Sequence, residues 1–285
     1  MTVSLRYPGG LEKALTLSYD DAVCEDFRLI DLMTEYGLKG TFNINSSQYC
    51  SEADFLSRPA DKWAHRMPMA RATALYSREG IEPAMHGLTH PWLEKLPVPQ
   101  MIYEIVQDRK NLEAQFGRIV RGMAYPYGTY SDKVIEVLRD CGVIYARTVQ
   151  STHRFELPTD FLKLHPTCHH ADPRLFELAV DFLNNRPAAY KDGWLFYLWG
   201  HAYEFERDHN WNLIEQFAET VGRREDIWYA TNGEIVEYVL AFRSLVFSLD
   251  GTRVYNPTDR TVWFLRDGVL FEVQSGQTRS LTEHA

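Results

Sequence analysis

The chain has 285 residues, of which 45% are hydrophobic and 24% are charged, a composition typical of an ordinary globular protein. Its formal net charge of −9 argues against a general nucleic-acid binder and against a protein of anionic membrane surfaces. No stretch approaches the ~18 consecutive apolar residues of a membrane span. This length predicts one large domain, or one domain with an appendage.

The N-terminal sequence and the cysteines indicate a cytoplasmic protein. The first eight residues, Met-Thr-Val-Ser-Leu-Arg-Tyr-Pro, lack the apolar core of a signal peptide. The four cysteines are scattered and show no Cys-x-x-Cys spacing: Cys24, Cys50, Cys141 and Cys168. We therefore expect reduced thiols rather than a disulfide framework or a zinc ribbon.

Strand-like and helix-like segments alternate along most of the chain. Strands are predicted over residues 14–19, 40–44, 81–85, 119–125, 143–146, 161–164, 194–199 and 227–229, and helices over 23–36, 70–77, 99–116, 131–139, 173–183, 211–221 and 232–242. Repeated βα units imply a mostly parallel sheet, and about seven such units, with polar residues gathered at the strand ends, suggest a closed or nearly closed barrel. In such barrels the chemistry takes place at the carboxyl ends of the strands.

The chain changes character from about residue 245. Short strand-like segments follow one another there, and Asp267-Gly268 between two of them is a hairpin signal. We therefore predict a barrel over residues 1–243 and a small C-terminal β appendage over residues 244–285.

Two motifs at predicted strand ends together suggest a metal site. Asp20 and Asp21 are adjacent, and neighbouring carboxylates resist joint ionisation unless a cation or an arginine compensates their charge. His86 and His90 lie four residues apart after a later strand. One aspartate and two histidines leave coordination positions open for water and substrate, as a catalytic metal requires. Taken alone, the aspartate pair is better explained by a surface turn and the histidine pair by ordinary loop histidines; only the two motifs together favour the metal.

Two further strand ends carry polar groups. Arg121 precedes the turn Tyr-Pro-Tyr-Gly, and an ion pair between Arg121 and Asp20 would keep that carboxylate ionised. In the same turn the backbone N–H of Tyr127 follows a proline and is available as an oxyanion donor. His201 comes directly after an apolar strand, where it either donates a proton or is an ordinary residue of the rim.

In chain order, these motifs resemble the polysaccharide deacetylase family (carbohydrate esterase family 4). The resemblance spans residues 15–204 and rests on Asp20-Asp21, His86-x-x-x-His90, Arg121-x-x-x-Tyr125-Pro126-Tyr127-Gly128 and His201. It implies a distorted (β/α) barrel and one divalent metal ion, usually Zn²⁺. The roles it implies are metal ligation by Asp21, His86 and His90, general base for Asp20 with Arg121 as its tether, oxyanion donor for the Tyr127 N–H, and general acid for His201.

The chain departs from the family's pattern in two places. Gly87 stands where the family commonly has Ser or Thr, and residues 145–152 contain no aspartate where the family's Asp-x-x-Asp-Trp motif is expected. That motif lines the groove and orients the acid histidine in the family. The histidines at 165, 169 and 170 are candidates for a pocket wall, a second metal cluster, or a mixture of rim and structural residues. Glu204 and Glu206 either orient His201 or are solvated.

The expected reaction is removal of acetyl groups, as amides or esters, from an acetylated sugar or oligosaccharide by metal-activated water. Tyr125, Trp199, Tyr203 and His165 are predicted to contact the sugar. Neither nucleic acid nor a membrane is expected as a partner, and a homo-oligomer is compatible with the sequence. Two alternatives stay open: a metal-dependent amidohydrolase acting on a small non-sugar amide, and a non-catalytic carbohydrate-binding protein on the same fold.

Overall fold

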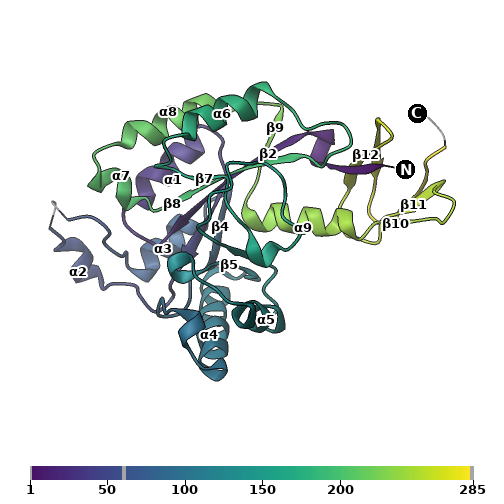
Figure 1. Ribbon diagram of the computed structural model, residues 1–285. Helices are drawn as coiled ribbons and strands as arrows, with labels where there is room; N and C mark the ends of the chain where they lie inside the picture. The colour runs from purple at the N-terminus through teal and green to yellow at the C-terminus, as the bar shows by residue number, and fades with distance from the viewer. Residues whose placement is uncertain (1, 60–61, 283–285) are drawn as a thin grey trace.

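A computed structural model describes residues 2–59 and 62–282 of the chain. At its centre lies a parallel sheet with seven strands in the order β6-β5-β4-β3-β2-β8-β7, and β9 also pairs with β2. This curled sheet forms a half-barrel, which confirms the predicted α/β fold of about seven strands (Figure 1). The strands are β2 (Lys13–Asp20), β3 (Gly40–Ile44), β4 (Ile81–Met85), β5 (Gly122–Ala124), β6 (Tyr145–Arg147), β7 (Cys168–His169), β8 (Trp194–Gly200) and β9 (Ile227–Tyr229).

Strand β2 is the central strand, and every residue in it is buried. Along one edge it pairs with β8, and along the other with β9 in its first half and β3 in its second half. Strands covered on both faces are typically continuous apolar runs, whereas β2 alternates apolar residues with the buried polar residues Thr16 and Ser18 before it ends at Asp20. The adjacent carboxylates therefore emerge at the carboxyl end of the middle of the sheet.

The predicted strand over residues 161–164 is wrong. Phe161–Lys163 forms a short 3-10 helix, because the side chain of Asp160 caps it by accepting a hydrogen bond of 2.9 Å from the Leu162 N–H. Leu164 directly after this turn still makes a single parallel bridge to Arg147. The segment therefore lies beside β6 without being a full strand.

Helices pack on either side of the curled sheet, with α1, α6 and α8 together on one side and α4 and α5 on the other (Figure 1). All seven predicted helices are present, with two short additional ones, α2 and α7. The bounds are α1 (Asp26–Glu35), α2 (Glu52–Leu56), α3 (Met69–Tyr76), α4 (Val98–Phe116), α5 (Asp132–Asp140), α6 (Leu175–Asn184), α7 (Tyr203–Arg207), α8 (Trp211–Val221) and α9 (Asn232–Arg243). Among the helices of the described ranges, none combines the length and the apolar character needed to cross a bilayer.

The C-terminal segment forms two small antiparallel sheets around a core of its own. Its strands are β10 (Val246–Phe247), β11 (Arg253–Tyr255), β12 (Val262–Arg266), β13 (Val269–Val273) and β14 (Thr278–Ser280). Asp267 and Gly268 join β12 to β13, both with positive φ, as a two-residue hairpin turn requires. The first strand of the chain, β1 (Val3–Arg6), pairs with β12, a contact that the sequence did not predict.

Candidate active site

A cavity of about 590 Å³ lies at the carboxyl ends of β2, β4, β5 and β8, where barrel chemistry was expected. Of the predicted site residues, only Arg121 and His165 are absent from its lining. The lining consists of Asp20, Asp21, His86, His90, Tyr125, Tyr127, Gly128, Val149, Trp199, His201 and Tyr203.

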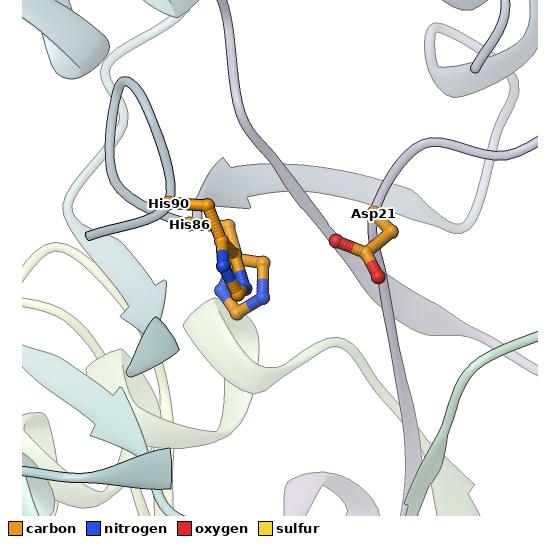
Figure 2. Close-up of side chains that lie close together, drawn as sticks. All are labelled: Asp21, His86 and His90. Carbon is orange, nitrogen blue, oxygen red and sulfur yellow. The ribbon is translucent and has the colours of Figure 1, made fainter. Parts of the chain in front are cut away.

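The three predicted metal ligands converge. Asp21, His86 and His90 each offer one donor atom, and these atoms all lie within 4.8 Å of one another. The two imidazoles lie side by side, and the Asp21 carboxylate lies across from them on the turn after β2 (Figure 2). Asp21 and His90 both have positive φ, so the backbone bends sharply at each ligand.

The chemistry of this donor set fits a divalent cation. Nδ1 of His86 lies 2.9 Å from the Ala124 carbonyl, which can only accept, so Nδ1 carries the proton and Nε2 is left with its lone pair. Burial lowers the pKa of His86, and burial together with the neighbouring His86 lowers the pKa of His90 to about 4, so both rings are neutral. Arg66 donates a hydrogen bond of 2.9 Å to Oδ1 of Asp21 and leaves Oδ2 free. Neutral imidazoles with a carboxylate oxygen are the ligands zinc prefers.

Helix α4 holds the histidine loop through two buried carboxylates one turn apart. Glu104 accepts hydrogen bonds from the backbone and the hydroxyl of Thr89, at 2.9 and 2.8 Å. Asp108 accepts from the backbone N–H of His86 at 3.1 Å, and burial raises its pKa to about 7. The sequence analysis did not identify these residues, because in the helical pattern they are only an acidic pair at i, i+4 spacing.

Asp20 is 2% exposed and surrounded by positive or polar groups. Asn43 donates a hydrogen bond of 2.8 Å to Oδ1, and Arg147 donates one to Oδ2. The Nε2 atoms of His86 and His201 lie 3.7 and 3.8 Å from Oδ2. Burial would raise the pKa of Asp20, but Arg147, His201 and the hydrogen bond from Asn43 outweigh burial and lower the pKa to about 2.

The prediction that Arg121 pairs with Asp20 is wrong. Arg121 is exposed and immediately precedes β5, at the end of that strand away from the cavity. Its expected role falls to Arg147, which is fully buried and pairs with Ala124 of β5 in the sheet register. Its guanidinium donates to Asp20 and also lies over the Trp199 ring, 4.4 Å from the ring centre.

Tyr127 lies in a short 3-10 turn, Pro126–Gly128, after β5. Its φ is 59°, an uncommon value for a residue with a side chain. The ring of His90 lies 4.4 Å from the Tyr127 ring, and the Trp92 ring stacks on it at 3.8 Å. A metal-ligand histidine and the predicted oxyanion donor are therefore packed against each other across two loops.

His201 follows β8, on the other side of β2 from the histidine loop after β4. Its Nδ1 lies 3.5 Å from Oε2 of Glu204, and its Nε2 lies 3.8 Å from Asp20. Burial lowers the pKa of His201, but the contact with Glu204 and the charges of Asp20 and Asp21 outweigh burial and raise it. The ring is therefore favoured in its protonated form.

The carboxylate of Glu204 lies close to His169 and His170 as well as to His201. Oε2 of Glu204 lies 3.0 Å from Nε2 of His169 and 3.2 Å from Nε2 of His170. His169, His201 and Glu204 also form a second group whose donor atoms lie within 4.8 Å of one another. Glu206 instead accepts a hydrogen bond of 2.8 Å from the Trp211 indole. Glu204, rather than Glu206, is thus the partner of His201.

Three of the four residues that were predicted to contact the sugar line the cavity. Tyr125, Trp199 and Tyr203 line the cavity. The Tyr125 hydroxyl donates a hydrogen bond of 2.8 Å to the Leu162 carbonyl. His165 lies outside the lining, because its Nδ1 is within 2.6 Å of the Thr148 hydroxyl.

The structure is similar to a candidate polysaccharide deacetylase from Mycobacterium smegmatis, with a TM-score of 0.57, 17% identity, and coverage of 84% of this chain and 94% of that one. That likeness supports a shared fold.

Two other solved structures give lower scores. A family 4 carbohydrate esterase from Streptomyces lividans in complex with acetate has a TM-score of 0.49 and 14% identity, over 76% of this chain and 92% of that one. The Streptococcus pyogenes deacetylase PplD in complex with acetate has a TM-score of 0.43 and 17% identity, over 52% of this chain and 61% of that one. No curated protein matches the chain by sequence.

The family comparison covers the segment that carries the first motifs of the site. Asp20, Asp21, His86 and His90 all fall within residues 8–146, whereas Arg147 and His201 lie beyond them. Over residues 8–146 the chain matches the family model described as polysaccharide deacetylase, and the resemblance drawn from its motifs is thereby confirmed.

Proposed function

We propose that the protein is a metal-dependent hydrolase that removes acetyl groups from an acetylated carbohydrate, as an N- or an O-deacetylase. The observation that carries the proposal is the buried, ionised Asp20 next to the convergent donor atoms of Asp21, His86 and His90 in one cavity. The family match over residues 8–146 supports carbohydrate deacetylation as the reaction. A protein that only binds sugar needs no such carboxylate.

In this proposal Asp21, His86 and His90 hold one divalent cation, with Zn²⁺ as the expected ion. When bound, the cation supplies Lewis acidity, which makes water a better nucleophile at neutral pH and polarises a carbonyl group. Neighbouring groups hold the donor atoms in place. Arg66 orients the Asp21 carboxylate, and the Ala124 carbonyl sets the tautomer of His86.

Asp20 accepts the proton of the attacking water. Its pKa of about 2 keeps it ionised throughout the neutral range, so it is always in the form that can accept. Arg147 and Asn43 each occupy one carboxylate oxygen and thereby fix the orientation of Asp20.

Tyr127 and His201 stabilise the later stages of the reaction. The backbone N–H of Tyr127 lies in the turn that lines the cavity, where it serves as donor to the developing oxyanion. His201, whose pKa is raised by Glu204 and the aspartates, donates a proton to the departing nitrogen or oxygen of the sugar.

The decisive experiment separates the paired aspartates. Asp20→Asn keeps the shape but removes the base, so metal content should stay at the wild-type level while acetate release from N- and O-acetylated sugars collapses. Asp21→Asn should lose metal as well as activity. Equal metal loss in both variants would show that the two roles are misassigned. Full activity of wild-type protein after chelation would refute the metal dependence.

The same assays test the alternatives. A metal-loaded protein that hydrolyses small amides but releases no acetate from any sugar would be an amidohydrolase of another substrate class. A protein that binds sugars and releases nothing from any substrate would be a carbohydrate-binding protein.

A further inference from the structure

Each of the two adjacent carboxylates at the end of β2 has an arginine beside it. Arg147 donates a hydrogen bond to Oδ2 of Asp20, and Arg66 donates one of 2.9 Å to Oδ1 of Asp21. Neighbouring carboxylates repel each other unless positive charge compensates them. Two guanidinium groups already supply that charge here, so the charge of the aspartate pair is balanced before a divalent cation binds.

Arg66 is fixed in this position by its backbone and by its side chain. Val23, two residues after Asp21, forms an antiparallel bridge with Arg66. The carbonyl of Arg66 accepts a hydrogen bond of 3.0 Å from the Cys50 thiol, and its guanidinium donates a further one of 2.8 Å to the Gln48 side chain. The arginine is therefore held against the turn that carries Asp21.

Arg66 and the expected cation share one carboxylate group. Arg66 takes Oδ1 of Asp21 and leaves Oδ2 for the cation, and the imidazoles of His86 and His90 lie across from this carboxylate (Figure 2). A guanidinium therefore lies on the far oxygen of a metal ligand. The Arg66 and Asp21 side chains are only 25% and 18% exposed, so solvent screens the repulsion between the guanidinium and a divalent cation only in part.

The guanidinium has two effects on cation binding, and they have opposite signs. It orients the Asp21 carboxylate, and losing an orienting partner of a ligand typically weakens metal binding about 10–100-fold. It also repels the cation, because both are positive. The backbone already fixes much of the orientation, since the Asp21 N–H donates a hydrogen bond of 3.0 Å to the Asn43 carbonyl and Val23 is bridged to Arg66. Repulsion is therefore the larger of the two effects.

We propose that Arg66 serves as the compensating charge of Asp21 in the cation-free protein and thereby weakens the binding of the divalent cation. The inference rests on the proposed function, which assigns the cation to Asp21, His86 and His90. It implies that the site is formed before the ion arrives and that the ion exchanges readily, whereas a structural ion would be needed for the fold.

The first test is the affinity for Zn²⁺, measured by competition with a chromophoric chelator. Arg66→Gln removes the charge but keeps an N–H donor, and should raise the affinity roughly tenfold or more. Arg66→Met, which is uncharged and of similar length, should change the affinity in the same direction. Arg66→Lys keeps the charge and should stay within about threefold of wild type.

The second test is Tm with and without Zn²⁺. Because binding stabilises the folded state in proportion to affinity, Zn²⁺ should raise the Tm of Arg66→Gln more than that of wild type. Most of this difference should come from a lower Tm of the cation-free variant. Arg71→Gln is the matched control, since it removes an exposed arginine that lies 3.0 Å from the Glu52 carboxylate. It should change neither the affinity nor the response of Tm to Zn²⁺.

The outcomes separate this inference from the proposed function. An affinity for Zn²⁺ in Arg66→Gln and Arg66→Met that is equal to or weaker than that of wild type would overturn the inference and leave deacetylation standing. A wild-type protein that binds Zn²⁺ but releases no acetate from any sugar would overturn the proposed function, while the affinities still decide the inference. A wild-type protein that binds no divalent cation would overturn both.

Discussion

The ion pair between Arg147 and Asp20 is the contact on which the reactivity of the site depends most directly. Both side chains are almost completely buried, so the pair is little screened by solvent. We expect Arg147→Ala to lower kcat by about 10²-fold or more, because Asp20 loses the charge that keeps it ionised and oriented.

Arg121→Ala is the matched control and should leave kcat within about twofold of wild type, since Arg121 is exposed and away from the cavity. Removing one partner of a buried pair also destabilises the fold, by about 3–5 kcal/mol. Circular dichroism and metal content should therefore accompany the kinetics, and Arg147→Lys keeps the charge if the alanine variant unfolds. If Arg121→Ala loses activity while Arg147→Ala keeps the wild-type rate, Arg121 would be the partner of Asp20, as the sequence predicted.

A second residue-level prediction concerns His201. An amine leaves a tetrahedral intermediate only after protonation, whereas a phenolate leaves without help. General-acid assistance is typically worth ~10²–10⁴ in rate. We expect His201→Ala to slow hydrolysis of an N-acetyl sugar by that order and to affect an aryl acetate far less. The measurement is kcat/KM for both substrates with metal occupancy checked; equal losses on the two would exclude His201 as the acid.

The sequence was sufficient to predict which aspartates and histidines meet, because Asp20-Asp21, His86 and His201 lie at the ends of predicted strands and His90 follows His86 in the same short loop. It failed for the arginine. Strand β5 is only three residues long and begins after Arg121, whereas β6 runs one residue past the predicted end and includes Arg147. Which of two arginines reaches Asp20 thus depends on strand ends and register, which composition and periodicity do not determine.

Among the elements, β4 carries an ionisable group at each of its two ends. His86 follows its carboxyl end at the site, while Glu82 near its other end is half-buried among hydrogen-bond donors. Glu82 accepts from Tyr145, from Thr41 and from the Gly233 N–H, each at 2.8 Å. Burial raises the pKa of Glu82 above its ordinary value of 4.5 despite these bonds.

A raised pKa has a defined consequence for stability. The folded protein keeps the Glu82 proton at a pH where the unfolded chain has released it, so this contribution is complete below about pH 4.5 and is lost as the pH rises through the folded pKa. Glu82→Gln should flatten that decline, because the amide stays neutral at every pH. Its oxygen can accept from Thr41 and Gly233, and its NH2 group can donate to the Tyr145 hydroxyl. The measurement is Tm against pH, with the exposed Glu79→Gln as control. An unchanged pH profile in Glu82→Gln would contradict the argument.

Among the elements, the helices were predicted most accurately, because a long amphipathic repeat of about 3.6 residues is hard to mistake for a strand. The failures were short elements. The 3-10 turn Phe161–Lys163 has strand-like composition, but the Asp160 cap decides its conformation. The buried carboxylates of α4 were also missed. An acidic residue on a helix is usually solvated, and only the position of the histidine loop in the folded protein shows that these two are covered.

At the level of the whole molecule, the appendage is joined to the barrel by β1. Residues 3–6 pair with β12, and the Tyr238 hydroxyl of α9 donates to the Arg6 carbonyl at 2.7 Å and accepts from the Trp263 N–H at 3.0 Å. The division at residue 243 remains a proposal, and this pairing suggests that the two parts do not separate cleanly.

Truncation after residue 243 should therefore lower Tm markedly, since it removes the strand partner of β1 and the second bond of Tyr238. Metal content should be retained in whatever fraction stays folded, because the cavity lining ends at Tyr203. Phe264→Ala, in the small core of the appendage, is the full-length comparison and should lower stability by about 3–5 kcal/mol with normal metal content. A folded truncated protein that no longer binds metal would show that the appendage helps to build the site.

The hairpin at Asp267-Gly268 was predictable because its turn chemistry is local. The partner of that hairpin was not, because Val3–Arg6 is a short strand whose pairing depends on a segment at the far end of the chain. Short sequence patterns carry no information on such distant pairings.

The pairing of β1 with β12 also affects how the chain folds while it is being synthesised on the ribosome. The two strands are roughly 260 residues apart, and at a synthesis rate of about 5–20 residues per second the second emerges on the order of 10–50 s after the first. During that interval β1 has an open edge while the half-barrel assembles beside it. The early nascent chain is therefore the form most exposed to mispairing and to capture by chaperones, and the last strands synthesised complete the edge that the first strand began.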